Sequence, residues 1–282
     1  MRKRNFWWLT LLTILPLANQ AAAGTDTKTQ ALRFDLYRDY LIVARGSAGP
    51  VKGLNFLLDT GASPTVLDRH LVQKLHLEES PASIAVLDGS VEAGRAVVPD
   101  LHLGPMQKQN LSVLVEDLSF FQKALPLHID AVIGLDVLGQ VPFEIDYTSR
   151  EIYFGSLPRL ANSLPFQIKA GLPIAEAQVD RVPVHLLVDT GASSIILFGP
   201  STPRPISPMR ISAVNAIGEA ERKQVWLHSL NLGEAKFGQE PAFMVRSRTD
   251  GNHDFDGLIS PAALGITKIA IDRDRGLLSF SR

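Results

Sequence analysis

Residues 56–63 read FLLDTGAS and residues 186–193 read LLVDTGAS, so one octapeptide pattern occurs twice at a spacing of 130 residues. In both copies a short apolar run ends at an aspartate that is followed by threonine, glycine, alanine and serine. Short apolar runs that end in turn-forming residues are typical of buried β-strands. The repeat therefore predicts two equivalent strands, each ending in a loop that carries Asp59 or Asp189.

A second pair of related segments follows these two copies. Residues 130–139 read DAVIGLDVLG, and residues 256–265, 126 positions later, read DGLISPAALG. The same spacing continues from residues 143–146 (FEID) to residues 269–272 (IAID). Because the motifs occur in the same order in both halves, the sequence is interpreted as an internal duplication.

The duplication divides the chain into an N-terminal lobe at residues 24–156 and a C-terminal lobe at residues 157–282. The pattern breaks at residues 155–158, which read GSLP, and a glycine followed by a proline is typical of a connection between domains. We expect the lobes to be homologous.

The rest of the pattern is mostly that of strands. Apolar runs predict a strand before each aspartate, at residues 54–58 and 184–188. Strand-like segments on either side of a polar turn predict two hairpins, formed by residues 144–147 with 151–154 and by residues 269–272 with 277–280. The spacing of Leu67, Leu71, Val72 and Leu75 predicts a short helix after the first octapeptide. The corresponding residues 199–205 (GPSTPRP) contain too many prolines for a regular helix. The predicted fold class is all-β with short helices.

The N-terminal residues are typical of a secretory signal peptide. Residues 1–4 read MRKR, an apolar run follows at residues 6–18, and three alanines at residues 21–23 provide a cleavage site. The apolar run is shorter than the roughly 20 residues that a spanning helix needs, so cleavage is favoured over an uncleaved anchor. We therefore expect a signal peptide at residues 1–23, a secreted or periplasmic protein, and no stable membrane span after cleavage.

Composition excludes several function classes. The formal net charge of -1 and the absence of a basic stripe argue against nucleic acid as a partner. The chain contains no cysteine, so disulfides, thiol catalysis and cysteine zinc sites are excluded. Its 7 histidines have no metal-binding spacing, and no serine lies in a Gly-x-Ser-x-Gly context. We expect neither a metal nor a cofactor.

Two aspartates can hydrolyse a peptide bond without a metal or a nucleophilic side chain. An ionised carboxylate takes a proton from water as general base, while a protonated one donates a proton toward the carbonyl oxygen. Two carboxylates held close together cannot both ionise, so one proton is shared and the pair titrates as a unit. Asp59 and Asp189 are therefore the predicted catalytic residues.

The residues after each aspartate have predicted supporting roles. Gly61 and Gly191 let the backbone approach the carboxylates, to which their N–H groups can donate. The hydroxyls of Thr60 and Thr190 can bond across the lobe interface. Ser63 and Ser193 can form hydrogen bonds within the turns.

These motifs together carry a family resemblance. A hydrophobic run, Asp-Thr-Gly-Ala and a later hydrophobic-Ile-Gly segment at residues 132–134 resemble the retropepsin-like and pepsin-like aspartic peptidases, especially secreted bacterial members with Ile-Asp-Tyr further on, as at residues 145–147. The resemblance covers nearly the whole chain after the signal peptide.

The resemblance implies two retropepsin-like acid-protease barrels in one chain, with a substrate cleft between them. It implies an aspartic endopeptidase that acts as a monomer on extended peptide or unfolded protein. A flap hairpin would cover the cleft, and Gly89 and Gly218 are the candidate flap turns. Ile133-Gly134 and Ile259-Ser260 would form the second-motif loops.

The second lobe departs from the family pattern. Ser260-Pro261 stands where a glycine and a hydrophobic residue are expected. This departure motivates an alternative, a non-catalytic bilobal peptide-binding or scaffolding protein of the cell envelope. Asp136 has no acidic counterpart, because Ala262 occupies its place, so we do not expect it to belong to machinery shared by the lobes.

The other repeated aspartates have a simpler interpretation. We expect turn and capping roles for Asp130, Asp146, Asp256 and Asp272, since they precede predicted helices or lie at hairpin ends.

Overall fold

The computed structural model describes residues 30–86, 89–123, 125–199, 209–215, 218–245 and 255–282. The predicted signal peptide and the proline-rich residues 200–205 lie outside these ranges. In the part described, no helix is long and apolar enough to cross a membrane.

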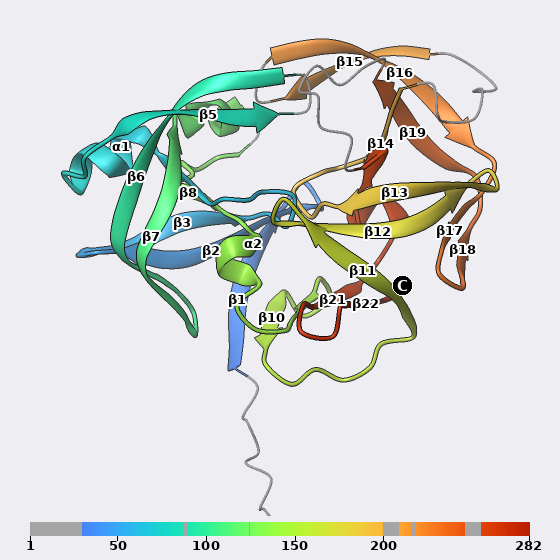
Figure 1. Ribbon diagram of the computed structural model, residues 1–282, viewed down its shortest axis with the longest axis horizontal. Coiled ribbons are helices and arrows are strands. Elements are labelled where there is room, and N and C mark those ends of the chain that lie inside the picture. Colours follow the sequence, from blue (N-terminus) through green and yellow to red (C-terminus); the bar gives the residue numbers. More distant parts are fainter. Residues whose placement is uncertain (1–29, 87–88, 124, 200–208, 216–217, 246–254) are drawn as a thin grey trace, which may run out of the picture.

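The chain is mostly β-structure, as the sequence predicts, and the order of the strands in the first half largely recurs in the second (Figure 1). Among the described residues α1 and η1 have no counterpart in the second half. The first half contains β1 (Gln30–Tyr37), β2 (Leu41–Ala48), β3 (Val51–Leu58), β4 (Val66–Asp68), α1 (Arg69–Lys74), β5 (Ser80–Val86), β6 (Gly89–Leu103), β7 (Met106–Glu116), the 3-10 helix η1 (Leu118–Lys123), β8 (Ala131–Ile133), α2 (Leu135–Leu138), β9 (Phe143–Asp146) and β10 (Glu151–Phe154). The second half contains β11 (Asn162–Lys169), β12 (Leu172–Val179), β13 (Val182–Val188), β14 (Ile195–Phe198), β15 (Met209–Asn215), β16 (Gly218–Leu227), β17 (Leu230–Leu232), β18 (Ala235–Phe237), β19 (Glu240–Val245), β20 (Gly257–Ile259), the 3-10 helix η2 (Ala262–Leu264), β21 (Lys268–Asp272) and β22 (Leu277–Ser281).

The strands before the two aspartates lie in equivalent surroundings. β3 pairs in parallel with β8, with Leu58 opposite Ile133, and β13 pairs in parallel with β20, with Val188 opposite Ile259. Parallel neighbours run in the same direction, so their C-terminal ends meet at the same edge. Each aspartate loop is therefore placed beside the second-motif loop of its own half.

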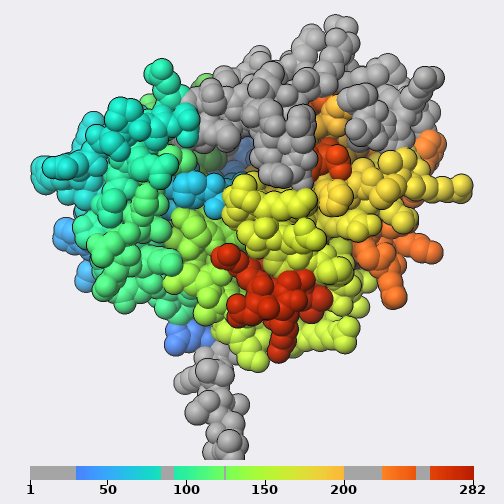
Figure 2. Space-filling model, in the orientation of Figure 1, coloured from blue at the N-terminus to red at the C-terminus, as the bar shows by residue number. Residues whose placement is uncertain are grey.

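One sheet joins the two halves at their base. The antiparallel pairing of β9 with β21 links β10 and β1 of the first half to β22 and β11 of the second. Phe143 lies opposite Ile271, and Ile145 lies opposite Ile269. In the repeat, Phe143 is equivalent to Ile269, and Ile145 is equivalent to Ile271. Exchanging the equivalent residues turns one of these two pairings into the other, so an approximate twofold axis relates the two strands. The space-filling view shows the red C-terminal residues packed among green and yellow segments from the middle of the chain (Figure 2).

A continuous apolar core runs through both halves. Its largest fully buried side chains include Phe56 in the first half, Phe143 in the joining sheet and Phe280 in the second half. Because this core and the joining sheet cross from one half to the other, burial of apolar surface opposes their separation.

The predicted strands and both hairpins are present, with two corrections of detail. The helix after the first octapeptide begins only at Arg69, because Leu67 lies in β4 and the Asp68 side chain caps the helix by accepting from the N–H of His70. Leu75 is the C-cap rather than an interior helical residue.

The second correction concerns the repeated aspartates. Asp146 and Asp272 accept hydrogen bonds from turn N–H groups, as expected of hairpin ends. Asp130 and Asp256 do not cap helices. The carboxylate of Asp130, which precedes β8, accepts from the N–H of Asn55 in β3 at 2.7 Å. The carboxylate of Asp256, which precedes β20, accepts from the N–H of His185 in β13 at 2.8 Å. Each therefore holds the segment before β8 or β20 against the strand that ends at a catalytic candidate.

Candidate active site

The two Asp-Thr-Gly loops meet face to face. Asp59 accepts a hydrogen bond from the N–H of Gly61 at 2.7 Å, and Asp189 accepts one from Gly191 at 2.8 Å. Each carboxyl group lies against the glycine of the opposite loop, and each acts on the pKa of the other. Thus side chains that are 130 residues apart in the chain form one carboxyl pair.

Both glycines are required by the close approach of the opposite loop. A Cβ atom added to Gly61 would lie 2.6 Å from the Cγ of Asp189, and one added to Gly191 would lie 2.6 Å from the Cγ of Asp59. Real Cβ atoms do not tolerate such distances to a fixed group. Each glycine therefore makes room for the carboxyl group of the other half.

The surroundings raise the pKa of both carboxyl groups. Burial is the largest cause for Asp59, and hydrogen bonds from Asp189 and from backbone N–H groups oppose it. For Asp189 burial again comes first, and the charge of Asp59 raises its pKa further, well above the ordinary value. Because desolvation and like charge both disfavour a doubly ionised pair, the two groups hold one proton between them over a range of pH.

The threonine hydroxyls tie the two loops together. The N–H of Thr60 donates to Oγ1 of Thr190 at 3.0 Å, and the N–H of Thr190 donates to Oγ1 of Thr60 at 3.1 Å. Oγ1 of Thr60 also donates to the carbonyl of Val188 at 2.7 Å. Both threonines are buried, so these bonds are shielded from water and fix the distance between the loops.

The second-motif loops support the aspartate loops from the side. The carbonyl of Ile133 accepts from the N–H of Asp59 at 3.0 Å, and that of Ile259 accepts from Asp189 at the same distance. A Cβ added to Gly134 would lie 2.4 Å from the carbonyl oxygen of Ala62, so this loop is packed directly against the first Asp-Thr-Gly-Ala turn. Ser260 occupies the equivalent place in the second half.

A partly buried polar link in the first half was not anticipated from the sequence. The carboxylate of Asp136 accepts from the N–H of Thr65 at 3.0 Å and from its hydroxyl at 2.7 Å. The same hydroxyl accepts from the N–H of Gly134 at 3.1 Å. In the second half Ile195 and Ala262 stand at the two equivalent positions. Both members of the link are thus polar in the first half and apolar in the second. This paired difference between the repeats is the signal that could have revealed the link.

The remaining predicted residues lie farther from the carboxyl pair. Ser63 packs against the β11–β12 turn, where a Cβ on Gly171 would lie 2.3 Å from its Oγ, and Ser193 Oγ lies 3.4 Å from Oγ of Ser194. Among the described residues, neither serine bonds to a carboxyl group of the pair.

The two flap candidates occupy equivalent backbone positions. Gly89 opens β6 opposite Val86, and Gly218 opens β16 opposite Asn215. Each therefore begins the second strand of an antiparallel pair, and both pairs, β5 with β6 and β15 with β16, lie along the same side of the molecule (Figure 1).

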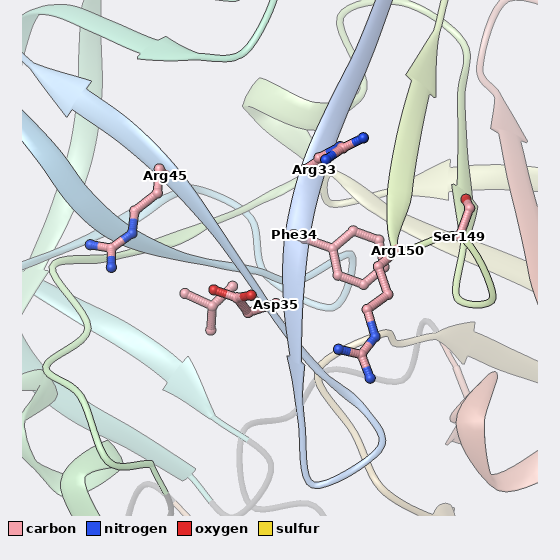
Figure 3. Close-up of a pocket in the computed structure, with 7 residues that line it drawn as sticks. Arg33, Phe34, Asp35, Arg45, Ser149 and Arg150 are labelled. Carbon is pink, nitrogen blue, oxygen red and sulfur yellow. The ribbon is translucent and has the colours of Figure 1, made fainter.

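A cavity of about 470 Å³ lies elsewhere, beside β1 and β2, and none of its lining residues belongs to the aspartate loops. Its guanidinium groups, from Arg33, Arg45 and Arg150, point in different directions rather than converging on one point (Figure 3). It is therefore separate from the carboxyl pair. Within the described ranges no three His, Asp or Glu side chains gather as metal ligands.

The comparison with known families bears on the first of the two loops. No curated protein matches the chain significantly. Residues 46–137 match a family model described as aspartyl protease, and this stretch contains Asp59 together with the second motif at Ile133-Gly134. In its first half, therefore, the chain is similar to the aspartyl proteases.

Proposed function

We propose that this chain is an aspartic endopeptidase in which Asp59 and Asp189 together activate a water molecule. The observation that carries the proposal is the approach of two carboxyl groups from equivalent loops, each lying against the glycine of the other loop and each acting on the pKa of the other. Burying two carboxyl groups side by side is costly for folding, and carboxyl groups with pKa values raised in this way cluster at functional sites.

The geometry suits general acid–base hydrolysis of an amide. The ionised carboxylate takes a proton from a water molecule bound between the two groups as the water oxygen attacks the scissile carbonyl carbon. The protonated carboxyl group donates its proton to the carbonyl oxygen, so no free oxyanion forms. As the C–N bond of the tetrahedral diol breaks, the group that took the water proton gives it to the leaving amine nitrogen. The other carboxylate takes a proton from a diol hydroxyl, so the acyl product leaves as a carboxylic acid and the pair is singly protonated again.

The apolar surroundings of the pair favour hydrophobic residues in the substrate. Leu57 and Val132 in the first half, and Leu187 and Leu258 in the second, anchor two equivalent apolar clusters. Partly buried residues that pack against the first cluster include Tyr37, Tyr40, Ala62, Phe120 and Phe121. An extended peptide that lies between the halves would place alternate side chains against such clusters.

The wider organisation belongs to the same proposal. The recurrence of elements and the symmetric β9–β21 register support two homologous barrels, at residues 24–156 and 157–282, in one monomeric chain. The composition of residues 1–23 supports export by a cleaved signal peptide to the periplasm or the exterior. Gly89 and Gly218 would then lie at the tips of flaps over the cleft.

The test is a set of three aspartate variants. Purified protein is incubated with unfolded protein substrates, and peptide release is measured for wild type, Asp59→Asn, Asp189→Asn and the control Asp274→Asn, which alters an exposed turn residue. The first two variants should lose activity by at least about 10³-fold, since each removes one partner of the proton exchange, while the control keeps it. Proteolysis at the wild-type rate in either dyad variant would refute the proposal. A wild type that binds a statine-type transition-state mimic without any turnover would favour the non-catalytic peptide-binding alternative.

A further inference from the structure

Pro261 removes a hydrogen bond that the first half of the protein makes. There, the N–H of Leu135 donates to the carbonyl of Ala62 at 3.0 Å and joins the second-motif loop to the Asp59 loop. Pro261 holds the position equivalent to Leu135, and proline has no N–H. Without a substitute, the carbonyl of Ala192 would lose its partner from that loop.

The hydroxyl of Ser260 fills this role. Its Oγ donates to the carbonyl of Ala192 at 2.6 Å and accepts from the N–H of Ala263 at 3.3 Å. The side chain is completely buried, so water does not compete for these bonds. In the first half a serine could not stand at this place, because even a Cβ on Gly134 would lie 2.4 Å from the Ala62 oxygen.

We propose that Ser260 is a positioning residue for Asp189: its hydroxyl replaces the backbone donor lost through Pro261 and holds the Asp-Thr-Gly-Ala turn of the second half in its active geometry. Ser260 and Pro261 are then a matched pair rather than a sign of lost function. The inference rests on the proposed peptidase function and concerns the same site.

Ala192 is the residue that connects Ser260 to the carboxyl pair. Its carbonyl accepts from Ser260, and its N–H acts on the carboxyl group of Asp189. This influence of the N–H opposes the rise in the pKa of Asp189 that burial causes. A loosened Ala192 would donate less well, so the pKa of the pair would rise and the orientation of Asp189 would be less fixed.

The decisive experiment exchanges the two solutions. Ser260→Gly removes the hydroxyl while Pro261 still lacks an N–H, and Ser260→Gly with Pro261→Leu restores the backbone donor in the form used by the first half. We expect the single variant to lose about tenfold in kcat, the effect of one buried hydrogen bond, and the double variant to recover to within about threefold of wild type. Ser279→Ala, at a buried serine in the joining sheet, is the control for loss of a buried hydroxyl and should keep full activity.

The pH dependence separates positioning from mere loss of stability. Ser260→Gly should move the pH–rate profile to higher pH, because the influence of the Ala192 N–H that favours ionised Asp189 is weakened. The double variant should return the profile to its wild-type position. A uniform drop in rate without a shift, or a double variant no better than the single one, would overturn the inference.

One further readout does not depend on activity. Amide hydrogen exchange at Ala192 should become faster in Ser260→Gly and slow again in the double variant. If the wild type proves inactive, the peptidase proposal fails while this measurement still decides whether Ser260 holds the loop. If the wild type is active and Ala192 exchanges equally in all three proteins, the inference fails and the peptidase proposal stands.

Discussion

Replacing Asp136 with alanine should destabilise the first half of the protein strongly. The carboxylate accepts two hydrogen bonds from Thr65, at 3.0 and 2.7 Å, and Thr65 is fully buried. Hydrogen bonds to a charged group contribute about 1.5–3 kcal/mol each. Asp136 itself is only half-buried, so water can replace part of the loss, and the expected cost is about 3 kcal/mol of unfolding free energy.

The second half indicates how this cost can be reduced. Ile195 and Ala262 occupy the equivalent positions without any polar link, so the fold accepts an apolar solution when both partners change. Thr65→Val with Asp136→Ala removes the buried hydroxyl along with its acceptor and should recover about half of the loss. Asp136→Asn keeps one acceptor and should cost about 1.5 kcal/mol.

Urea unfolding, followed by far-ultraviolet circular dichroism, gives the unfolding free energy of each protein. Wild type, Thr65→Val, Asp136→Ala and the double variant form a double-mutant cycle, and Asp136→Asn is measured beside them. A coupling energy between Thr65 and Asp136 of at least about 1 kcal/mol is expected for partners in one network. Additive effects, or an Asp136→Ala variant within about 0.5 kcal/mol of wild type, would refute the reasoning.

Three further predictions follow from buried groups elsewhere. Gly61→Ala should abolish proteolysis, because its Cβ would meet the carboxyl group of Asp189 at 2.6 Å, whereas Gly238→Ala, which meets nothing within 4 Å, should leave the rate of peptide release unchanged; equal rates in the two variants would contradict the proposed geometry. Glu144 is buried, and burial raises its pKa, so its ionisation destabilises the folded state as pH rises above the pKa of an unfolded glutamate. Glu144→Gln should therefore raise the melting temperature more at pH 8 than at pH 4. An increase in melting temperature that is the same at both pH values would be evidence against this sign. Burial raises the pKa of both dyad carboxyls, so the shared proton should persist, and proteolysis continue, at pH values less acidic than pepsin's optimum; a rate maximum near about pH 2 would be inconsistent with that environment.

Local patterns predicted the strands that lead to the aspartates and the two hairpins that join the halves. In those segments apolar periodicity, turn residues and the internal repeat all favour one structure, and the structure contains them. The pairing of β9 with β21 could not be read from sequence in the same way, because it joins residues such as Ile145 and Ile269 that are far apart in the chain. The start of α1 was misplaced because Leu67 fits a helical spacing but is held in β4 by its sheet partners.

In the candidate site, too, some features could be predicted from the sequence and others could not. The sequence predicted Asp59 and Asp189 as a pair, because two carboxyl groups that share a proton can hydrolyse a peptide bond and the repeated octapeptide provides two equivalent aspartates. The link between Asp136 and Thr65, and the replacement of a backbone donor by Ser260, depend on the separation between loops to within a few tenths of an ångström. Such distances follow from packing rather than from residue type, so the sequence showed the Ser260-Pro261 departure without showing what compensates for it.

The sheet that β9 and β21 share bears on what each half could do alone. A fragment that ends after β10 would leave the outer edge of β9 without hydrogen-bond partners and would bare the apolar residues Phe143 and Ile145. Unpaired edges recruit other strands, and the nearest complementary edge in solution would be the β9 of a second identical fragment. The symmetric register allows this pairing, but it sets the buried Glu144 opposite its own copy where the intact chain has Ala270. Self-association of the separated N-terminal half should therefore weaken as pH rises and these carboxyl groups ionise, and where it forms it would place two copies of Asp59 where the intact chain places two different aspartates.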